Sequence, residues 1–157
     1  MKNLIYYLSK KVYSTTVQKK VLKDLYNFIP KTALTILVLS ILFVYTFKSQ
    51  IDSIILLNIW FTTVNALSIL RVYDYINFKK EKYFNSNRYY IKFYTKAITN
   101  ALLWGLLPVL FIHQIDHYHQ LIMIIFLLVF AGGVSGFLFD FRISFPFISI
   151  LLLPLFF

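Results

Sequence analysis

The stretch LIMIIFLLVFAGGVSGFLF, residues 121–139, decides the fold class of this chain. It contains no charged residue, and crossing a hydrocarbon core of about 30 Å takes roughly 20 apolar residues in an α-helix. Working outward, four further apolar blocks lie at about 32–47, 53–70, 97–112 and 143–157. We therefore expect an all-α transmembrane protein, a polytopic helical bundle with four full spans plus a fifth at the C-terminus.

The composition of the 157-residue chain agrees with a membrane protein. Hydrophobic residues make up 59% and charged residues only 14%, with a mean hydropathy of +0.71, whereas roughly a quarter of the residues in soluble domains are charged. The chain has no Cys, which excludes disulfides, thiolate zinc sites and cysteine nucleophiles. No nucleotide-binding, zinc-protease or nucleophile-elbow motif is present. We therefore expect no cofactor and no enzymatic activity from these residues.

The positive charges predict the orientation in the membrane. Fourteen of the sixteen Lys and Arg residues fall within 1–31 and 71–96, and such residues collect in cytoplasmic loops because positive charge resists transfer. We therefore expect a cytoplasmic N-terminus, an external 113–120 loop and a multi-pass location in a bacterial inner (cell) membrane. The net charge of +10 then matches a bilayer with an anionic inner leaflet as partner, and nucleic acid is not expected.

The two ends of the chain give further expectations. Residues 1–31 predict a basic amphipathic cytoplasmic N-terminal segment lying on the inner leaflet, or alternatively a regulatory arm, ahead of a transmembrane bundle at 32–157. The fifth block runs to Phe157 without a polar stop. This pattern favours a longer protein with at least one more span. The alternative is a complete small protein whose fifth block packs as a partial span.

All three histidines lie in one short loop between the third and fourth blocks. His113, His117 and His119 surround Asp116, and imidazole with carboxylate at such spacing can bind Zn²⁺, Ni²⁺ or Cu²⁺. Histidines near their usual pKa can also sense external pH. The alternative is a polar turn without a metal.

A polar helix face is expected in the second block. Asn58, Thr62 and Asn65 are spaced i, i+4 and i+7, which places them on one side of a helix. Polar groups in lipid need partners, so this face should point into the bundle, with Asn100 as its partner. Interhelical hydrogen bonding and a small-ligand pocket are the two interpretations.

Small residues in the fourth block predict a helix-contact surface. Gly132 and Gly136 form a G-x-x-x-G pair, and Ala131 and Ser135 form a second pair with the same spacing. Small side chains let two helix backbones approach closely. The contact could lie within the chain or in a homodimer.

Several runs along the chain resemble a known group of proteins. These are NIWFTTVNALSILRVYDY, ITNALLWGLLPVLF and LLVFAGGVSG, with matching positions at Trp60, Arg71, Trp104, Gly105, Ala131, Gly132 and Pro154. Together they resemble the N-terminal multi-span membrane sensory region of bacterial signalling proteins, many of which end in a diguanylate cyclase (GGDEF-type) domain.

The resemblance implies a sensory or input module that controls a cytoplasmic output domain, which is missing here or is a separate protein. No catalytic residue can be carried over, because no output domain is present. The contrasting hypothesis is a stand-alone small integral membrane protein, either a transporter subunit or a structural partner in a complex.

Overall fold

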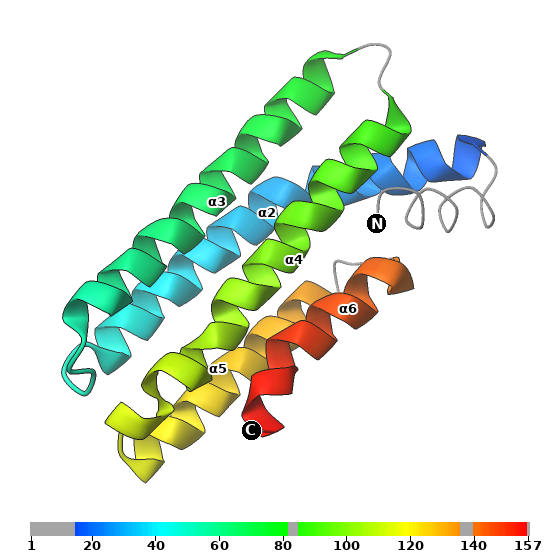
Figure 1. Cartoon of the computed structure of the whole chain (residues 1–157). Helices are drawn as coiled ribbons and strands as arrows, with labels where there is room; N and C mark the ends of the chain where they lie inside the picture. Colours follow the sequence, from blue (N-terminus) through cyan, green and yellow to red (C-terminus); the bar gives the residue numbers. More distant parts are fainter. Residues whose placement is uncertain (1–14, 82–84, 136–139, 157) are drawn as a thin grey trace.

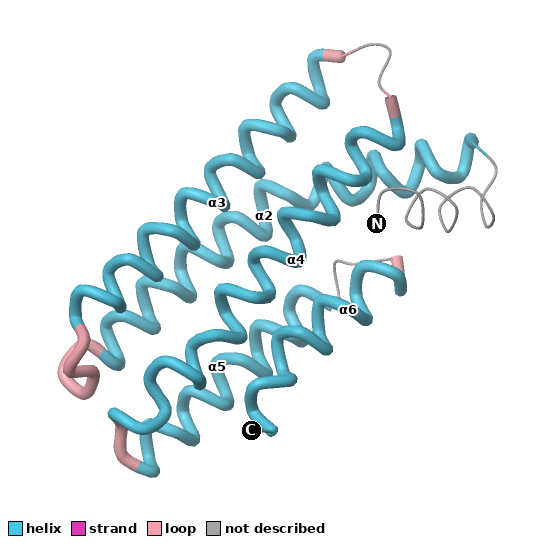
Figure 2. Tube along the Cα trace, in the orientation of Figure 1, coloured by secondary structure: helices cyan, strands magenta, loops and turns pink. Residues whose placement is uncertain are grey.

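The computed structural model describes residues 15–81, 85–135 and 140–156, and no strand occurs in these ranges (Figure 2). The all-α class is therefore confirmed for the described residues. Their helices are α2 (Thr15–Phe47), α3 (Ile54–Lys80), α4 (Ser86–Phe111), α5 (His117–Ser135) and α6 (Phe141–Leu152), with short 3₁₀ turns η1 (Ile112–Gln114) and η2 (Leu153–Phe156).

Three helical stretches in the described part of the chain are long and apolar enough to cross a membrane: Lys19–Phe47, Ile54–Lys80 and Ser86–Gln114. Two more, His117–Gly133 and Phe141–Leu155, are apolar but shorter. These lengths support a helical membrane protein. The expected count of four full spans plus a fifth is finer than this finding and stays a prediction.

Large apolar side chains cover much of the outer surface. Ile55 is 78% exposed, Ile69 69% and Leu34 63%, and each belongs to one of the long helices. Soluble proteins rarely expose apolar surface on this scale. Hydrocarbon chains of a bilayer would cover it without cost, because lipid tails are as apolar as these side chains.

The helices form an elongated bundle. α2 lies along α3, and α4 carries α6 on its other side, with α5 beside both (Figure 1). The end of α3 and the start of α4 meet at one end of the bundle, which we call the basic end because Lys79, Lys80, Arg88, Lys92 and Lys96 lie there. The loops at 48–53 and 112–116 lie at the opposite end.

A chain of aromatic rings joins four helices in the middle of the core. The ring centroids of Phe43 and Trp60 are 5.1 Å apart, and those of Trp60 and Trp104 are also 5.1 Å apart. Trp104 stacks on Phe130 of α5 at 4.5 Å. Trp60 Nε1 donates a 2.8 Å hydrogen bond to the carbonyl oxygen of Leu103, so the indole is held in place as well as buried.

The first helix is longer than the first apolar block. α2 contains 33 residues, about 50 Å at 1.5 Å per residue, and it runs without a break through Pro30. Its early apolar face is buried, with Tyr26 stacked on Phe78 at 4.4 Å. Leu22, Leu25, Tyr26 and Ile29 thus face the core of the bundle. The basic amphipathic segment expected at 1–31 stays a prediction. Residues 1–14 lie outside the described ranges.

The close helix contact made by a glycine is at Gly105, between α4 and α6. A Cβ atom added there would lie 2.8 Å from the carbonyl oxygen of Ile150 and 3.3 Å from the Cα of Leu151. Atoms essentially never approach so closely, so only glycine allows these two helices to pack at this distance.

The small-residue pattern of the fourth block leads to a different result. Gly132 is exposed, and a Cβ atom added to it would meet no atom of the described residues within 4 Å. The prediction of a close helix contact within the chain is therefore wrong at Gly132, because α5 turns its buried face elsewhere, with Ala131 in the core. Gly136 and the side chain of Ser135 lie outside the described parts.

Candidate functional site

A buried polar cluster lies at the basic end of the bundle. Because α3 continues past the expected span end at Leu70, its buried face extends through Ser68, Arg71, Asp74 and Phe78, which recur every three or four residues. We name the set Thr32, Arg71, Asp74, Lys92 and Lys96 the Arg71 cluster. It joins α2, α3 and α4.

Asp74 ties α3 to α4 through two lysines. Its Oδ2 lies 2.6 Å from Lys96 Nζ, and its Oδ1 lies 3.8 Å from Lys92 Nζ. Lys96 also donates a 3.1 Å hydrogen bond to the carbonyl oxygen of Leu70. The side chain of Asp74 is only 9% exposed, so this ion pair is screened far less than a surface pair.

Arg71 is a deeply buried cation of the cluster, and no acidic residue of the described ranges is its partner. It is 8% exposed, donates one long hydrogen bond of 3.5 Å to Thr32 Oγ1, and its Cζ lies 5.8 Å from the ring centroid of Phe93. All six acidic residues of the chain are within the described ranges. None of them forms an ion pair with Arg71 within 4.0 Å.

Aromatic side chains enclose the cluster at the basic end. Tyr26 donates a 3.1 Å hydrogen bond to the carbonyl oxygen of Tyr89, and its ring centroid lies 5.9 Å from that of Phe93. The rings of Phe78 and Tyr89 meet edge to face at 5.2 Å. These rings are buried, and the guanidinium of Arg71 lies over the ring of Phe93, in surroundings where charge interactions are stronger than in water.

The cluster carries a net positive charge with one buried end and one accessible end. Arg71, Lys92 and Lys96 contribute three positive charges against the single carboxylate of Asp74, leaving an excess of two. The side chains of Lys92 and Lys96 are 39% and 24% exposed. The arrangement can therefore attract an anion at the surface and offer it a buried guanidinium.

The polar face predicted for the second block does not point into the bundle. Asn58 and Thr62 are exposed, so the prediction is wrong for both. The buried face of α3 is set by larger apolar side chains, Leu57, Trp60 and Val64, and their burial outweighs that of a short polar side chain.

The expected partnership of Asn65 with Asn100 is also wrong. Asn65 Nδ2 donates to Ser40 Oγ on α2 at 3.1 Å and to the carbonyl oxygen of Phe61 at 2.8 Å. Asn100 is buried, and neither its amide nitrogen nor its amide oxygen hydrogen-bonds to any described residue.

The histidine loop forms a helix cap. Asp116 Oδ1 accepts a 2.8 Å hydrogen bond from the backbone N–H of His119 and lies 2.7 Å from His119 Nδ1. The backbone hydrogen bond is the larger cause and the side-chain contact the next, and both lower the pKa of the Asp116 carboxyl. His117 Nδ1 instead lies 3.2 Å from Gln120 Oε1, and His113 is exposed. Among the described residues no three His, Asp or Glu side chains are grouped to hold a metal ion.

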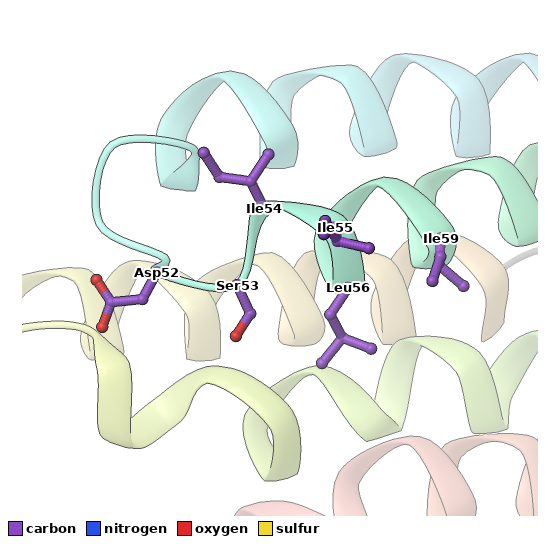
Figure 3. A pocket seen from close by; sticks show the side chains of 6 residues that line it. All are labelled: Asp52, Ser53, Ile54, Ile55, Leu56 and Ile59. Atoms are coloured by element: carbon purple, nitrogen blue, oxygen red, sulfur yellow. The ribbon is translucent and has the colours of Figure 1, made fainter.

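A surface hollow of about 370 Å³ lies at the start of α3. It is lined by Asp52, Ser53, Ile54, Ile55, Leu56 and Ile59. Their side chains fan out without converging on a common point (Figure 3). With one exposed carboxylate and one hydroxyl among isoleucines and a leucine, the hollow offers no arrangement for chemistry.

Comparison of the chain with protein families, curated proteins and solved structures gives no match in any of the three. The Arg71 cluster was not among the sequence-predicted sites, because the second span was expected to end at Leu70. The i, i+3 spacing of Arg71 and Asp74, followed by Phe78, was the available signal that the helix and its buried face continue.

Proposed function

We propose that this chain is a membrane-embedded sensory or input module of a bacterial signalling protein, with its N-terminus and basic end in the cytoplasm. The supporting observation is the Arg71 cluster, a buried ionic network that joins α2, α3 and α4 at that end. Four full spans and a fifth belong to this proposal. So does control of a cytoplasmic output domain.

The geometry of Asp74 supports a switching role. Its two partners, Lys92 and Lys96, are one helical turn apart on α4, at 3.8 and 2.6 Å. A shift of α4 along α3 by one turn, about 5.4 Å, would exchange one lysine for the other. Exchanges of this kind are a recognised way for packed helices to switch between two discrete states. The shift would move the start of α4 at the basic end.

Reporter fusions test the proposed orientation. A fusion after Tyr83 should report cytoplasm, and a fusion after His117 should report the outside. Residues 71–96 hold seven Lys and Arg, whereas residues 113–120 hold none. If both fusions report the same side, the orientation is wrong.

The signalling role is tested on the complete product of the gene that encodes this chain. Expressed in a bacterium, it should change the level of cyclic di-GMP, and Lys92→Gln should alter that change at equal membrane abundance. Lys80→Gln is the matched control, because Lys80 is an exposed lysine of the basic end outside the Arg71 cluster. A product that leaves cyclic di-GMP unchanged and has no kinase activity would defeat the proposal. The preferred hypothesis would then be a stand-alone membrane protein, either a transporter subunit or a structural partner in a complex.

A further inference from the structure

We infer that the Arg71 cluster binds the phosphate group of an anionic ligand, supplied either by a membrane lipid or by a soluble phosphate compound. This goes beyond the signalling role and does not depend on it, since the site would exist in a purely structural protein.

The charge balance requires an anion. Asp74 is already shared by Lys96 at 2.6 Å and Lys92 at 3.8 Å, so it is not available to Arg71. An uncompensated buried charge is strongly destabilising, and a charge among transmembrane helices is normally paired or faces an aqueous cavity. None of the six acidic side chains of these 157 residues compensates Arg71, because all six lie in the described ranges and none pairs with it.

The donors of Arg71 fit a phosphate. A guanidinium has five N–H donors in a fixed planar fork, and among the described residues Arg71 uses one of them, in the 3.5 Å bond to Thr32. Thr32 itself donates to the carbonyl oxygen of Ile29 at 3.0 Å, so its hydroxyl proton is already committed. Arginine forks bind phosphate oxygens in pairs, and nearby lysines add point charges.

A cleft beside Thr32 favours a lipid as the source. It has a volume of about 120 Å³ between α2 and α5 and is lined by Thr32, Thr35, Ile36, Leu39, Val129, Phe130 and Gly133. Its wall is mostly apolar, yet it includes the hydroxyl-bearing residue that Arg71 contacts. An acyl chain suits such a wall while the headgroup reaches the cations. Basic pockets between transmembrane helices on the cytoplasmic side bind lipid headgroups in this manner.

The test uses the full 157-residue chain, purified in an uncharged detergent. Thermal unfolding is followed with added phosphatidylglycerol, phosphatidylcholine or inorganic phosphate. A ligand that binds only the folded state raises the unfolding temperature. Stabilisation by phosphatidylglycerol alone identifies a lipid site, and stabilisation by inorganic phosphate identifies a soluble source. If neither has an effect, the inference is overturned.

Two variants connect the effect to the cluster. Arg71→Gln should weaken phosphatidylglycerol binding roughly tenfold or more, the loss expected for a charge-assisted hydrogen bond. Lys80→Gln removes the same charge at the same end and should weaken it less than about twofold, as expected for a screened surface charge. If both variants weaken phosphatidylglycerol binding equally, the binding is general electrostatic attraction to the basic end, and the inference is overturned.

A second measurement covers the case in which Arg71→Gln does not fold. Native mass spectrometry of the wild-type protein, purified from a mixed bilayer, should show phosphatidylglycerol retained well above its share of the lipid. Lys92→Gln, a change at the accessible side of the cluster, should lower that retention. Retention of phosphatidylglycerol and phosphatidylcholine in proportion to the bilayer would contradict the proposed site.

Discussion

The three long helices and the two short ones are held together in different ways. α2, α3 and α4 meet through polar side chains that are far apart in the sequence, such as Asp74 with Lys96 and Arg71 with Thr32. α5 and α6 are held mainly by close apolar packing. The ring of Phe130 on α5 stacks on Trp104, and Gly105 lets α6 approach α4 closely.

This difference indicates where a change of state can arise. Apolar packing among close-fitting helices has one good arrangement, whereas an ionic network can exchange partners. A long-range polar contact also reaches the start of α6, the 2.9 Å hydrogen bond from the Tyr90 hydroxyl to Asp140 Oδ2. Asp140 caps the start of α6 by accepting from the backbone N–H of Arg142 at 3.1 Å, so this contact positions a helix end.

The largest expected effect comes from the long helices. Asp74→Asn leaves three cations without a carboxylate in a largely buried site, and removing one partner of such a pair costs about 3 kcal/mol or more. We expect the free energy of unfolding in detergent to fall by about that amount, measured by SDS or heat titration.

Asp52→Asn serves as the control for that change. Asp52 is an exposed acid in the loop before α3, and surface substitutions usually stay within about 0.5 kcal/mol. If Asp74→Asn proves as mild as Asp52→Asn, the ionic network does not hold the long helices together.

A smaller effect is expected where the short helix α6 meets α4. Gly105→Ala brings a Cβ to 2.8 Å from the Ile150 carbonyl oxygen, and overpacking of this kind costs about 1–3 kcal/mol. Gly132→Ala meets no atom of the described residues within 4 Å and should be neutral or stabilising by up to about 1 kcal/mol, because alanine is the better helix former. If the two variants unfold at the same temperature, close packing at Gly105 does not hold α6 against α4.

The sequence was sufficient for those features that depend on composition and period. The apolar blocks predict the helices, and the structure places a helix over each of them, although α2 and α3 extend well beyond their blocks. Helix ends were harder to predict because charged residues such as Arg71 and Asp74 normally mark the end of a span. Here their spacing keeps them on the buried face of a continuing helix.

Helix rotation was the second feature that the sequence could not provide. The spacing of Asn58, Thr62 and Asn65 defines one face correctly, but which face turns inward depends on the volume of Trp60 and its neighbours. The same holds for Gly105 and Gly132. A small-residue pattern shows that close approach is possible, whereas the helix that makes the approach is fixed only by the tertiary packing.

The smallest expected effect concerns the cap of α5, a contact made within a single turn of chain. Asp116→Ala removes the carboxylate that accepts the His119 backbone N–H at 2.8 Å, and α5 should lose some stability at pH 7. The effect should be smaller than the other two, because Asp116 is exposed and solvent screens its charge.

The pH dependence distinguishes this cap from a simple change of side chain. The pKa of Asp116 is lowered in the folded protein, first by the backbone hydrogen bond from His119 and then by its side chain. Its contribution to stability is therefore complete above the unfolded pKa of about 3.9 and is lost as the pH falls through the lower folded value. The difference in unfolding temperature between wild type and Asp116→Ala should be present at pH 7 and shrink below about pH 4. If the difference is unchanged in acid, the charge of the Asp116 carboxylate does not stabilise the start of α5.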